Sequence, residues 1–208
     1  MPNWKIHVEI GMRLNKYLKY NEEELNLFLL GSVLPDINNG WIVPDASKII
    51  EHDITHMGSF IEASYDKFYN KYKYEIDTKN PIFLGYMVHI YTDAIWNNNF
   101  YTSVKNLNVK YGNLDELKLM KQSDFKVYKN KFIANIIEIK NIDKALKEIQ
   151  KIDTICVTKE DILKSIEFLK NEETYNFQYK FYTESKLDKL MDDTLNGLIE
   201  LLKGNRVI

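Results

Sequence analysis

Residues 81–100 read PIFLGYMVHIYTDAIWNNNF, and the rest of the chain is organised around this stretch. Its first sixteen residues are apolar on nearly every side, a pattern that predicts a helix buried over most of its surface. Two ionisable residues inside it, His89 and Asp93, lie one helical turn apart and therefore share a face. Burying an imidazole and a carboxylate is costly unless they pair or bind a metal. The stretch therefore predicts a buried His–Asp pair or part of a metal site.

The size and composition of the chain favour one helical domain. Its 208 residues suit a single domain with a sizeable core, and Gly and Pro, which break helices, number only 8 and 4. The 28 Lys and Arg against 30 Asp and Glu leave a net charge of −2, so no general attraction for nucleic acid is expected. The single cysteine, Cys156, excludes an intramolecular disulfide and any multi-cysteine metal site. Because we see no transmembrane run and no secretory signal, we expect a cytoplasmic protein.

Helical periodicity recurs along the whole chain, so we predict an all-α, bundle-like single domain over residues 1–208. A loop is predicted over 31–54, where two prolines and a glycine interrupt the pattern. Thr55 is predicted to cap a helix that runs to about Tyr74, and Pro81 to open the central helix. The other predicted helices span 4–20, 22–32, 113–139, 141–152, 158–169 and 183–203.

The residues that could bind a metal gather in about the first half of the chain, 1–106, and none of the four histidines lies in the lysine-rich second half, 107–208. Asp36 follows a proline just past a predicted helix end, a position that can aim its carboxylate inward. Imidazoles and carboxylates without thiolates suit Zn²⁺, and Fe, Mn or Ni less well. Several helices of a bundle can each deliver such ligands to one site. The candidate metal ligands are His7, Asp36, His56, His89 and Asp93, with His52 ranked behind His56.

These residues resemble a known family. Trp4 and His7, G-S-x-L-P-D at 31–36, T-H at 55–56 and L-G-Y-x-x-H-x-x-x-D at 84–93 are similar to elements of the zinc-dependent phospholipase C family, which is related to zinc nucleases. The resemblance covers roughly residues 1–106. It implies an all-α enzyme that binds up to three zinc ions and hydrolyses phosphodiester bonds.

The resemblance also implies a role for each ligand. Asp36, His56, His89 and Asp93 would form one complete metal site, and Asp93 would bridge to a second metal that His7 also binds.

The chain departs from the family at the third metal, which the family binds through further histidines after the H-x-x-x-D element. Here no histidine follows His89, the nearby positions 97–99 are asparagines, and the only obvious carboxylates beyond are Glu116 and Asp124. We therefore expect one or two zinc ions, with other divalent metals as alternatives.

Two other metalloenzyme classes compete with this interpretation. The segment HDITH, residues 52–56, is similar to the zinc-protease motif H-E-x-x-H, but Asp53 is one methylene shorter than the general-base glutamate. An HD-type metal phosphohydrolase would use His7, the His52–Asp53 pair and Asp93, and would leave Asp36 and His89 without a role.

The sequence thus favours a phospholipase C-like metal-dependent hydrolase that acts on a small-molecule or lipid head-group phosphoester. Asp36 is the candidate catalytic residue, because a ligand carboxylate beside an open loop could also accept the proton of the attacking water. The alternative from a different class is a non-catalytic helical protein with a degenerate or structural metal site. Nothing in the sequence predicts the oligomeric state.

Overall fold

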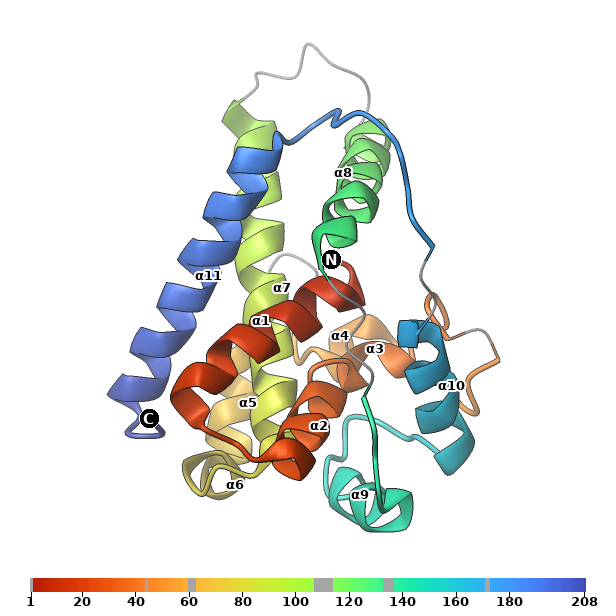
Figure 1. The fold of residues 1–208 in the computed structure, drawn as a ribbon, viewed down its shortest axis with the longest axis vertical. Helices are drawn as coiled ribbons and strands as arrows, with labels where there is room; N and C mark the ends of the chain where they lie inside the picture. Colours follow the sequence, from red (N-terminus) through yellow and green to blue (C-terminus); the bar gives the residue numbers. More distant parts are fainter. Residues whose placement is uncertain (1, 44, 60–62, 107–113, 133–136, 171–172) are drawn as a thin grey trace.

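The computed structural model describes residues 2–43, 45–59, 63–106, 114–132, 137–170 and 173–208. Within these residues the chain forms eleven α-helices and no β-strand, which confirms the predicted all-α fold (Figure 1). None of the described helices has both the length and the apolar character needed to cross a membrane. The helices are α1 (Trp4–Leu18), α2 (Glu22–Gly31), α3 (Leu34–Ile37), α4 (His52–Thr55), α5 (Tyr65–Lys71), α6 (Lys73–Asp77), α7 (Pro81–Asn106), α8 (Leu114–Tyr128), α9 (Ile142–Ile149), α10 (Lys159–Lys170) and α11 (Glu184–Gly204), with a short 3-10 turn, η1 (Lys129–Lys131), after α8.

Helix α7 is the axis of the fold, with α1, α2, α5, α6 and α11 packed against it (Figure 1). It begins at Pro81, as predicted, because the missing amide hydrogen of a proline costs nothing in the first turn. Every residue from Ile82 to Asp93 is buried, so this part of α7 has no solvent-facing side. The uniformly apolar sequence of the stretch is therefore explained by neighbours on all sides.

The tightest helix contact brings the backbones of α2 and α7 together. A Cβ atom added to Gly31 would lie 2.4 Å from the Ile82 carbonyl oxygen, and one added to Gly85 would lie 2.2 Å from that of Phe28. Side chains at these positions would push the two helices apart, since backbone atoms cannot yield as a flexible side chain can. The two glycines thus fix the end of α2 against the first turns of α7.

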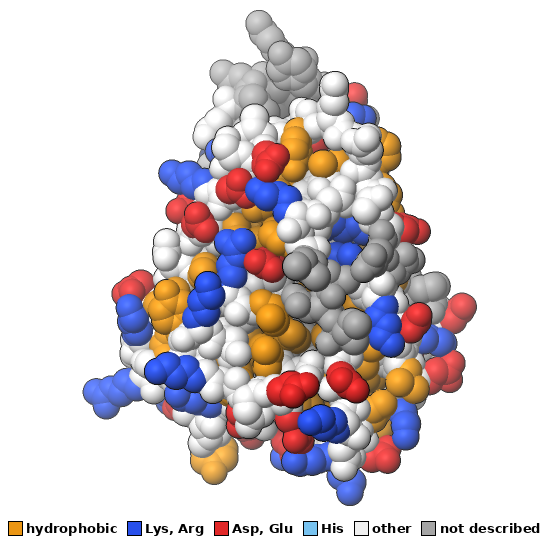
Figure 2. Space-filling model, viewed as in Figure 1, with side chains coloured by type: hydrophobic (Ala, Val, Ile, Leu, Met, Phe, Trp, Pro, Cys, Tyr) orange, Lys and Arg blue, Asp and Glu red, His pale blue; other side chains and the backbone are white. Residues whose placement is uncertain are grey.

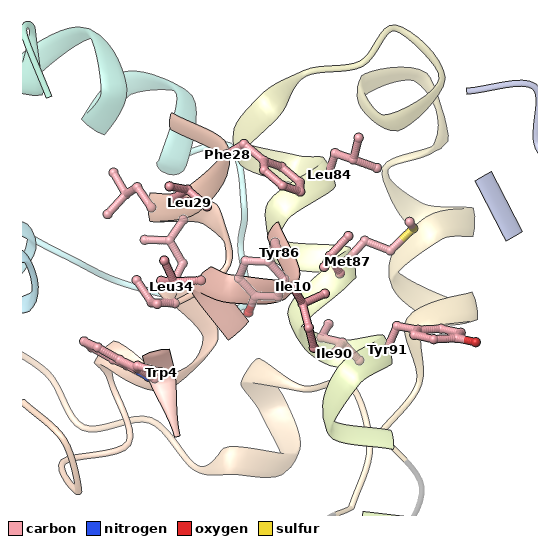
Figure 3. Packing of buried hydrophobic residues seen from close by; sticks show 14 of the residues in the cluster. Trp4, Ile10, Phe28, Leu29, Leu34, Leu84, Tyr86, Met87, Ile90 and Tyr91 are labelled. Atoms are coloured by element: carbon pink, nitrogen blue, oxygen red, sulfur yellow. The ribbon is translucent and has the colours of Figure 1, made fainter. Parts of the chain in front are cut away.

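The apolar core fills the space around this contact. Figure 3 shows Ile10 of α1, Phe28 of α2 and Met87 and Ile90 of α7 meeting in one cluster, and all four side chains are fully buried. Figure 2 shows acidic and basic side chains interspersed over one face of the molecule, as the near-neutral net charge leads one to expect.

The predicted helix from Thr55 to Tyr74 is wrong. The segment forms three short helices, α4, α5 and α6, and Thr55 is the last residue of α4 rather than a cap. The cap of α5 is Ser64, whose side chain accepts from the backbone N–H of Lys67. The predicted loop over 31–54 likewise contains α3 and the start of α4. These short helices matter because they carry three of the candidate ligands.

The second half contains the predicted helices, with one of them too long. Helix α8 ends at Tyr128, and Glu138 donates its backbone N–H to the side chain of Asn26 instead of continuing a helix to 139. Residues 113 and 133–136 of that prediction lie outside the described residues. Thr158 and Asp161 form a capping box at the start of α10, because the side chain of each accepts from the backbone N–H of the other.

Two polar contacts tie the loop after α3 to the second half of the chain. Asn38 makes two hydrogen bonds to the backbone of Cys156, at 2.9 and 3.0 Å. Asp161 accepts hydrogen bonds from the backbone and the hydroxyl of Ser47. Helix α10 also contacts α3, so the second half buttresses the elements that carry the site.

Candidate metal centre

Helix α7 carries His89 and Asp93 one turn apart, and both side chains are fully buried. The His89 Nδ1–H donates to the carbonyl oxygen of Ser32, 2.7 Å away at the end of α2. The glycine contact between α2 and α7 holds that carbonyl in place. Because a carbonyl can only accept, Nδ1 of His89 bears the proton and Nε2 turns a lone pair towards the interior.

His7 reaches the same place from α1. Asn3 caps this helix by accepting from the backbone N–H of Lys5, so His7 lies in the first helical turns with its side chain directed into the core. Its ring stacks on that of His89, with centroids 4.0 Å apart, and its Nε2 lies 3.4 Å from Asp93 Oδ1. Neither nitrogen of His7 has a hydrogen-bond partner among the described residues.

Asp36 lies on α3, in the Leu-Pro-Asp segment, with its carboxylate turned inward as predicted. The indole N–H of Trp4 donates to Oδ2 at 3.0 Å, and the Asn39 side chain donates to Oδ1 at 2.9 Å. Oδ1 lies 3.7 Å from His56 Nε2, and Oδ2 lies 3.7 Å from His89 Nε2. Both oxygens are thus oriented by neutral donors and remain open towards the imidazoles.

His52 and His56 flank the single turn of α4, with their rings stacked 3.7 Å apart. Thr55 lies between the two histidines as the last residue of α4, and both rings enter the same site. The Thr55 hydroxyl donates to the His52 carbonyl at 3.1 Å and lies 2.8 Å from His56 Nδ1. The hydroxyl has one hydrogen, so it accepts from His56 Nδ1–H, and Nε2 of His56 presents a lone pair.

Asp93 stands at the centre of the cluster. Its Oδ1 faces His7 alone, whereas its Oδ2 lies 3.2 Å from His56 Nε2 and 3.6 Å from His89 Nε2. Neither oxygen has a hydrogen-bond donor among the described residues, although both are fully buried. A buried carboxylate without donors is costly, since it loses its hydration and gains nothing in return.

The arrangement concentrates lone pairs. His56 Nε2 and His89 Nε2 are 3.2 Å apart, and each of these rings already uses its Nδ1–H elsewhere. Oxygens of Asp36 and Asp93 complete the ring of acceptors. Acceptors at this separation repel one another unless a cation lies among them, and the cations available to such a site are a proton or a metal ion.

The electrostatics of the cluster keep His7, His52 and Asp93 in the forms that can bind a metal at neutral pH, whereas the raised pKa of His89 means that a metal ion would have to displace a proton from it. Burial, together with the neighbouring His89, lowers the pKa of His7 to about 4, and burial lowers the pKa of His52 to about 4. Burial opposes protonation of His89, but the Asp36 and Asp93 carboxylates outweigh it and raise its pKa. Burial would raise the pKa of Asp93, but the surrounding imidazoles outweigh it and hold that pKa well below its usual range. Deprotonated imidazole and carboxylate are the forms that bind metals.

The structure brings all six predicted residues together, including His52. They form three overlapping sets in which every ligand atom lies within 4.8 Å of the others, so these buried groups could hold a metal ion. The sets are His7, His89 and Asp93; Asp36, His56 and His89; and His52, His56 and Asp93.

The roles of three other residues could not be identified from the sequence. Ser32, Asn39 and Thr55 act through a backbone carbonyl or a short local contact, and although Ser32 and Thr55 lie in the elements G-S-x-L-P-D and T-H, those elements do not indicate what they contact. Of the carboxylates considered for a further metal, Asp124 instead accepts three backbone N–H groups from residues 180–182, and Glu116 is exposed on α8.

A cavity of about 460 Å³ lies beside the cluster. Asn97, which follows Asp93 by one turn of α7, lines it, and so does Tyr101 one turn further. Trp41, whose ring stacks 6.1 Å from that of His52, forms another part of its wall. The remaining lining includes Pro2, Asn3, Ile42, Lys118, Lys121, Gln122 and Lys126.

Comparisons with known proteins find no matching family model, curated protein or solved structure. The chemistry of this protein must therefore be inferred from the geometry of the site.

Proposed function

We propose that this chain is a metal-dependent phosphoester hydrolase, with zinc as the expected ion. The observation that carries the proposal is the fully buried Asp93 carboxylate, which has three imidazoles around it and no hydrogen-bond donor among the described residues. A cation held by these groups would satisfy acceptors that otherwise oppose one another.

The two oxygens of Asp93 support a site for two ions. Oδ1 faces His7, and Oδ2 faces His56 and His89, so one carboxylate can contribute to two neighbouring positions. Asp36 would complete the second position, since both His56 and His89 lie beside its oxygens. The set contains only imidazole and carboxylate ligands, which zinc accepts readily.

Orientation of the ligands by their neighbours also favours a metal. The Ser32 carbonyl, the Thr55 hydroxyl and the Trp4 indole each fix one ligand through its outward-facing atom. Such outer partners are usual around metal-binding histidines and carboxylates, because they set the tautomer and the ring orientation.

The neighbouring cavity supports an anionic substrate. Three lysines line it, and Lys121 is only 5% exposed. The Lys121 ammonium lies 4.4 Å from the centre of the Phe100 ring, and burial lowers its pKa. A buried ammonium in a cavity gains from an anionic ligand, and phosphate groups are typical partners of lysine. When bound, zinc would supply Lewis acidity that activates water near neutral pH and offsets charge on phosphoryl oxygens.

Asp36 would combine two roles in this proposal. Its carboxylate is oriented by Trp4 and Asn39 and turned towards the imidazoles, as a ligand must be. Each of its oxygens keeps a lone pair beyond these hydrogen bonds, so Asp36 could also accept the proton of the attacking water.

Competing enzyme classes require Asp53, and its position disfavours them. Its side chain is 61% exposed and lies outside the three ligand sets, although its Oδ1 is 3.5 Å from His52 Nδ1. An HD-type hydrolase needs this aspartate as a ligand, and a zinc protease needs it as the general base. A non-catalytic metal protein is the second candidate, because the chain lacks the histidines that bind the third metal in the phospholipase C family.

Metal content and turnover together test the proposal. Protein purified without chelator should contain one or two equivalents of zinc by mass spectrometry and should hydrolyse bis-p-nitrophenyl phosphate. Asp93→Asn keeps the shape of the side chain but removes its charge, so it should lose both metal and turnover. The control is Asp53→Asn, which changes an exposed aspartate next to His52 and should keep both. Stoichiometric metal without turnover of any phosphoester would favour the non-catalytic candidate, and absence of metal would refute the metal site itself.

A further inference from the structure

A second cavity lies on the other side of Trp4 from the metal cluster. It has a volume of about 210 Å³, and the Trp4 ring forms part of its wall while the indole N–H donates to Asp36. Phe168 of α10 packs edge-on against Trp4 with ring centroids 5.5 Å apart. The lining is completed by Asn3, Lys5, Lys126, Lys129, Leu169, Glu173 and Tyr175.

The charge of this cavity is positive. Lys5, Lys126 and Lys129 contribute three cations, against the single carboxylate of Glu173. Within the described residues, none of the three lysines lies within 4.0 Å of a carboxylate oxygen. Three positive charges against one carboxylate leave an excess of positive charge, which an anionic ligand would offset.

Lys129 is the most buried of the three lysines, since only 8% of the residue is exposed, and its charge is therefore the one least screened by solvent. Its ammonium lies 4.7 Å from the centre of the Tyr175 ring, and that of Lys126 lies 5.3 Å from the same ring. Burial lowers the pKa of Lys129, and the positive charges of Lys5 and Lys126 lower it further, while the Glu173 carboxylate acts in the opposite direction. The aromatic ring compensates the two ammonium groups only in part, because a cation–π contact is weaker than an ion pair with a dianion.

The two cavities adjoin at the start of α1. Asn3 and Lys126 line both of them, so the two cavities share part of their wall. Lys5 and Lys129 line the second cavity only, whereas Lys118 and Lys121 line the first only.

We propose that the second cavity binds a phosphate group, and that the substrate is a phosphoester that carries this second phosphate beside the scissile one. The substrate assignment rests on the proposed hydrolase function, whereas the phosphate site depends only on the lysine cavity. The three lysines that line this cavity supply the positive charge that a phosphate dianion requires, and Lys binds phosphate as a point charge.

Direct binding of inorganic phosphate tests the site without any turnover. The indole ¹⁵N–¹H signals of the protein as purified report on separate places, because Trp4 lines the second cavity, Trp41 lines the first and Trp96 is buried against Thr194. Phosphate should shift the Trp4 signal saturably and leave that of Trp96 unmoved. Absence of a saturable Trp4 shift in the wild type would overturn the proposal.

Variants assign the shift to the lysines. Lys5→Met and Lys129→Met should each weaken the phosphate affinity read from Trp4 by roughly tenfold, the effect of losing one charge-assisted hydrogen bond. Lys131→Met removes a charge two positions from Lys129, but that lysine pairs with Glu184 and Asp188, so the affinity should not change. Lys5 is only partly buried, so the test survives even if Lys129→Met fails to fold. A Trp4 shift that is equal in all four proteins would place the phosphate elsewhere and refute the site.

A matched pair of substrates tests the second half of the proposal. Thymidine 5′-(p-nitrophenyl phosphate) with a 3′-phosphate should be hydrolysed with a kcat/KM roughly tenfold above that of the compound lacking it, and Lys5→Met should abolish the difference. If inorganic phosphate shifts the Trp4 signal but the enzyme hydrolyses both substrates equally well, the second cavity is an independent anion site and the substrate assignment is refuted. Failure of both substrates to react, with the Trp4 response intact, would count against the hydrolase and leave the phosphate site standing.

Discussion

At the scale of single residues, the ring nitrogens and carboxylate oxygens of the cluster point lone pairs at one another, and each lone pair needs a proton or a metal ion as its partner. His56 and His89 commit one nitrogen to an outward hydrogen bond, and this leaves the other as an acceptor facing Asp36 and Asp93. Six residues of two types, four histidines and two aspartates, could be identified from the sequence as candidate ligands because imidazole and carboxylate are scarce in apolar surroundings. The outward partners could not, since a carbonyl such as that of Ser32 belongs to every residue.

Trp4 gives a prediction about such an outward partner. Trp4→Phe removes the N–H that donates to Asp36 Oδ2 but keeps an aromatic ring in the core. We expect metal affinity to fall by roughly 10- to 100-fold, as is usual when a partner of a ligand is lost. Competition with a colorimetric zinc chelator measures the change. The control is Trp96→Phe, which also deletes a buried indole donor, to Thr194, and should leave metal affinity unchanged.

The two histidines of α4 give a second prediction at this scale. His56 belongs to two of the three ligand sets and His52 to one, so His56→Ala should release most of the bound metal and His52→Ala should release less. The measurement is the number of metal ions bound per protein molecule in each variant after gel filtration. Losses of equal severity would mean that both histidines bind one ion, and a greater loss from His52→Ala would reverse the order in which the sequence ranked them.

At the scale of secondary-structure elements, long periodic helices were predictable and the short ones were not. Helix α7 was predictable from the proline at its start and from an apolar run that only a helix packed on all sides tolerates. The interval 31–64 instead holds the four-residue helices α3 and α4, which are too short for a periodic pattern and depend on tertiary contacts for their stability. The Thr55 hydroxyl bonds back to the His52 carbonyl within α4, a local contact that sequence alone cannot distinguish from capping of a following helix.

The glycine contact between α2 and α7 yields a prediction at the element scale. Gly85→Ala places a Cβ 2.2 Å from the Phe28 carbonyl oxygen, so the helices must separate. We expect a loss of stability of about 1–3 kcal/mol or more, as for other overpacked cores, and weaker metal binding because the Ser32 carbonyl moves with α2. Urea unfolding and metal titration measure the two effects.

Gly204→Ala is the matched control for that change. It lies at the end of α11 with no atom within 4 Å of an added Cβ, so the same substitution should be neutral or stabilise the protein by up to about 1 kcal/mol. If Gly85→Ala were as mild as Gly204→Ala, the close approach of α2 and α7 would not be what positions His89.

At the scale of the whole molecule, the site joins elements that are far apart in the sequence. Ligands come from α1, α3, α4 and α7, and α10 supports α3 from the second half of the chain. The sequence could indicate which residues belong together, because their chemistry is shared. It could not indicate the two lysine-lined cavities, since those combine the start of α1 with α8, η1 and residues near α10.

Because four helices meet at the cluster, a bound metal should stabilise the entire fold. An ion that binds only the native state adds RT ln(1 + [L]/Kd), or about 4 kcal/mol when the free ion is at a thousand times its Kd. A chelator should therefore lower the thermal midpoint of the wild type by several degrees or more. Asp93→Ala removes the carboxylate that faces three of the imidazoles, so its midpoint should start lower and hardly respond to the chelator. The alternative, a buried ion pair without metal, predicts a destabilised Asp93→Ala but no effect of chelator on the wild type. A wild-type midpoint that stays fixed in chelator, in protein that carries no metal, would leave His89 and Asp93 as a buried pair and would remove the basis of the hydrolase proposal.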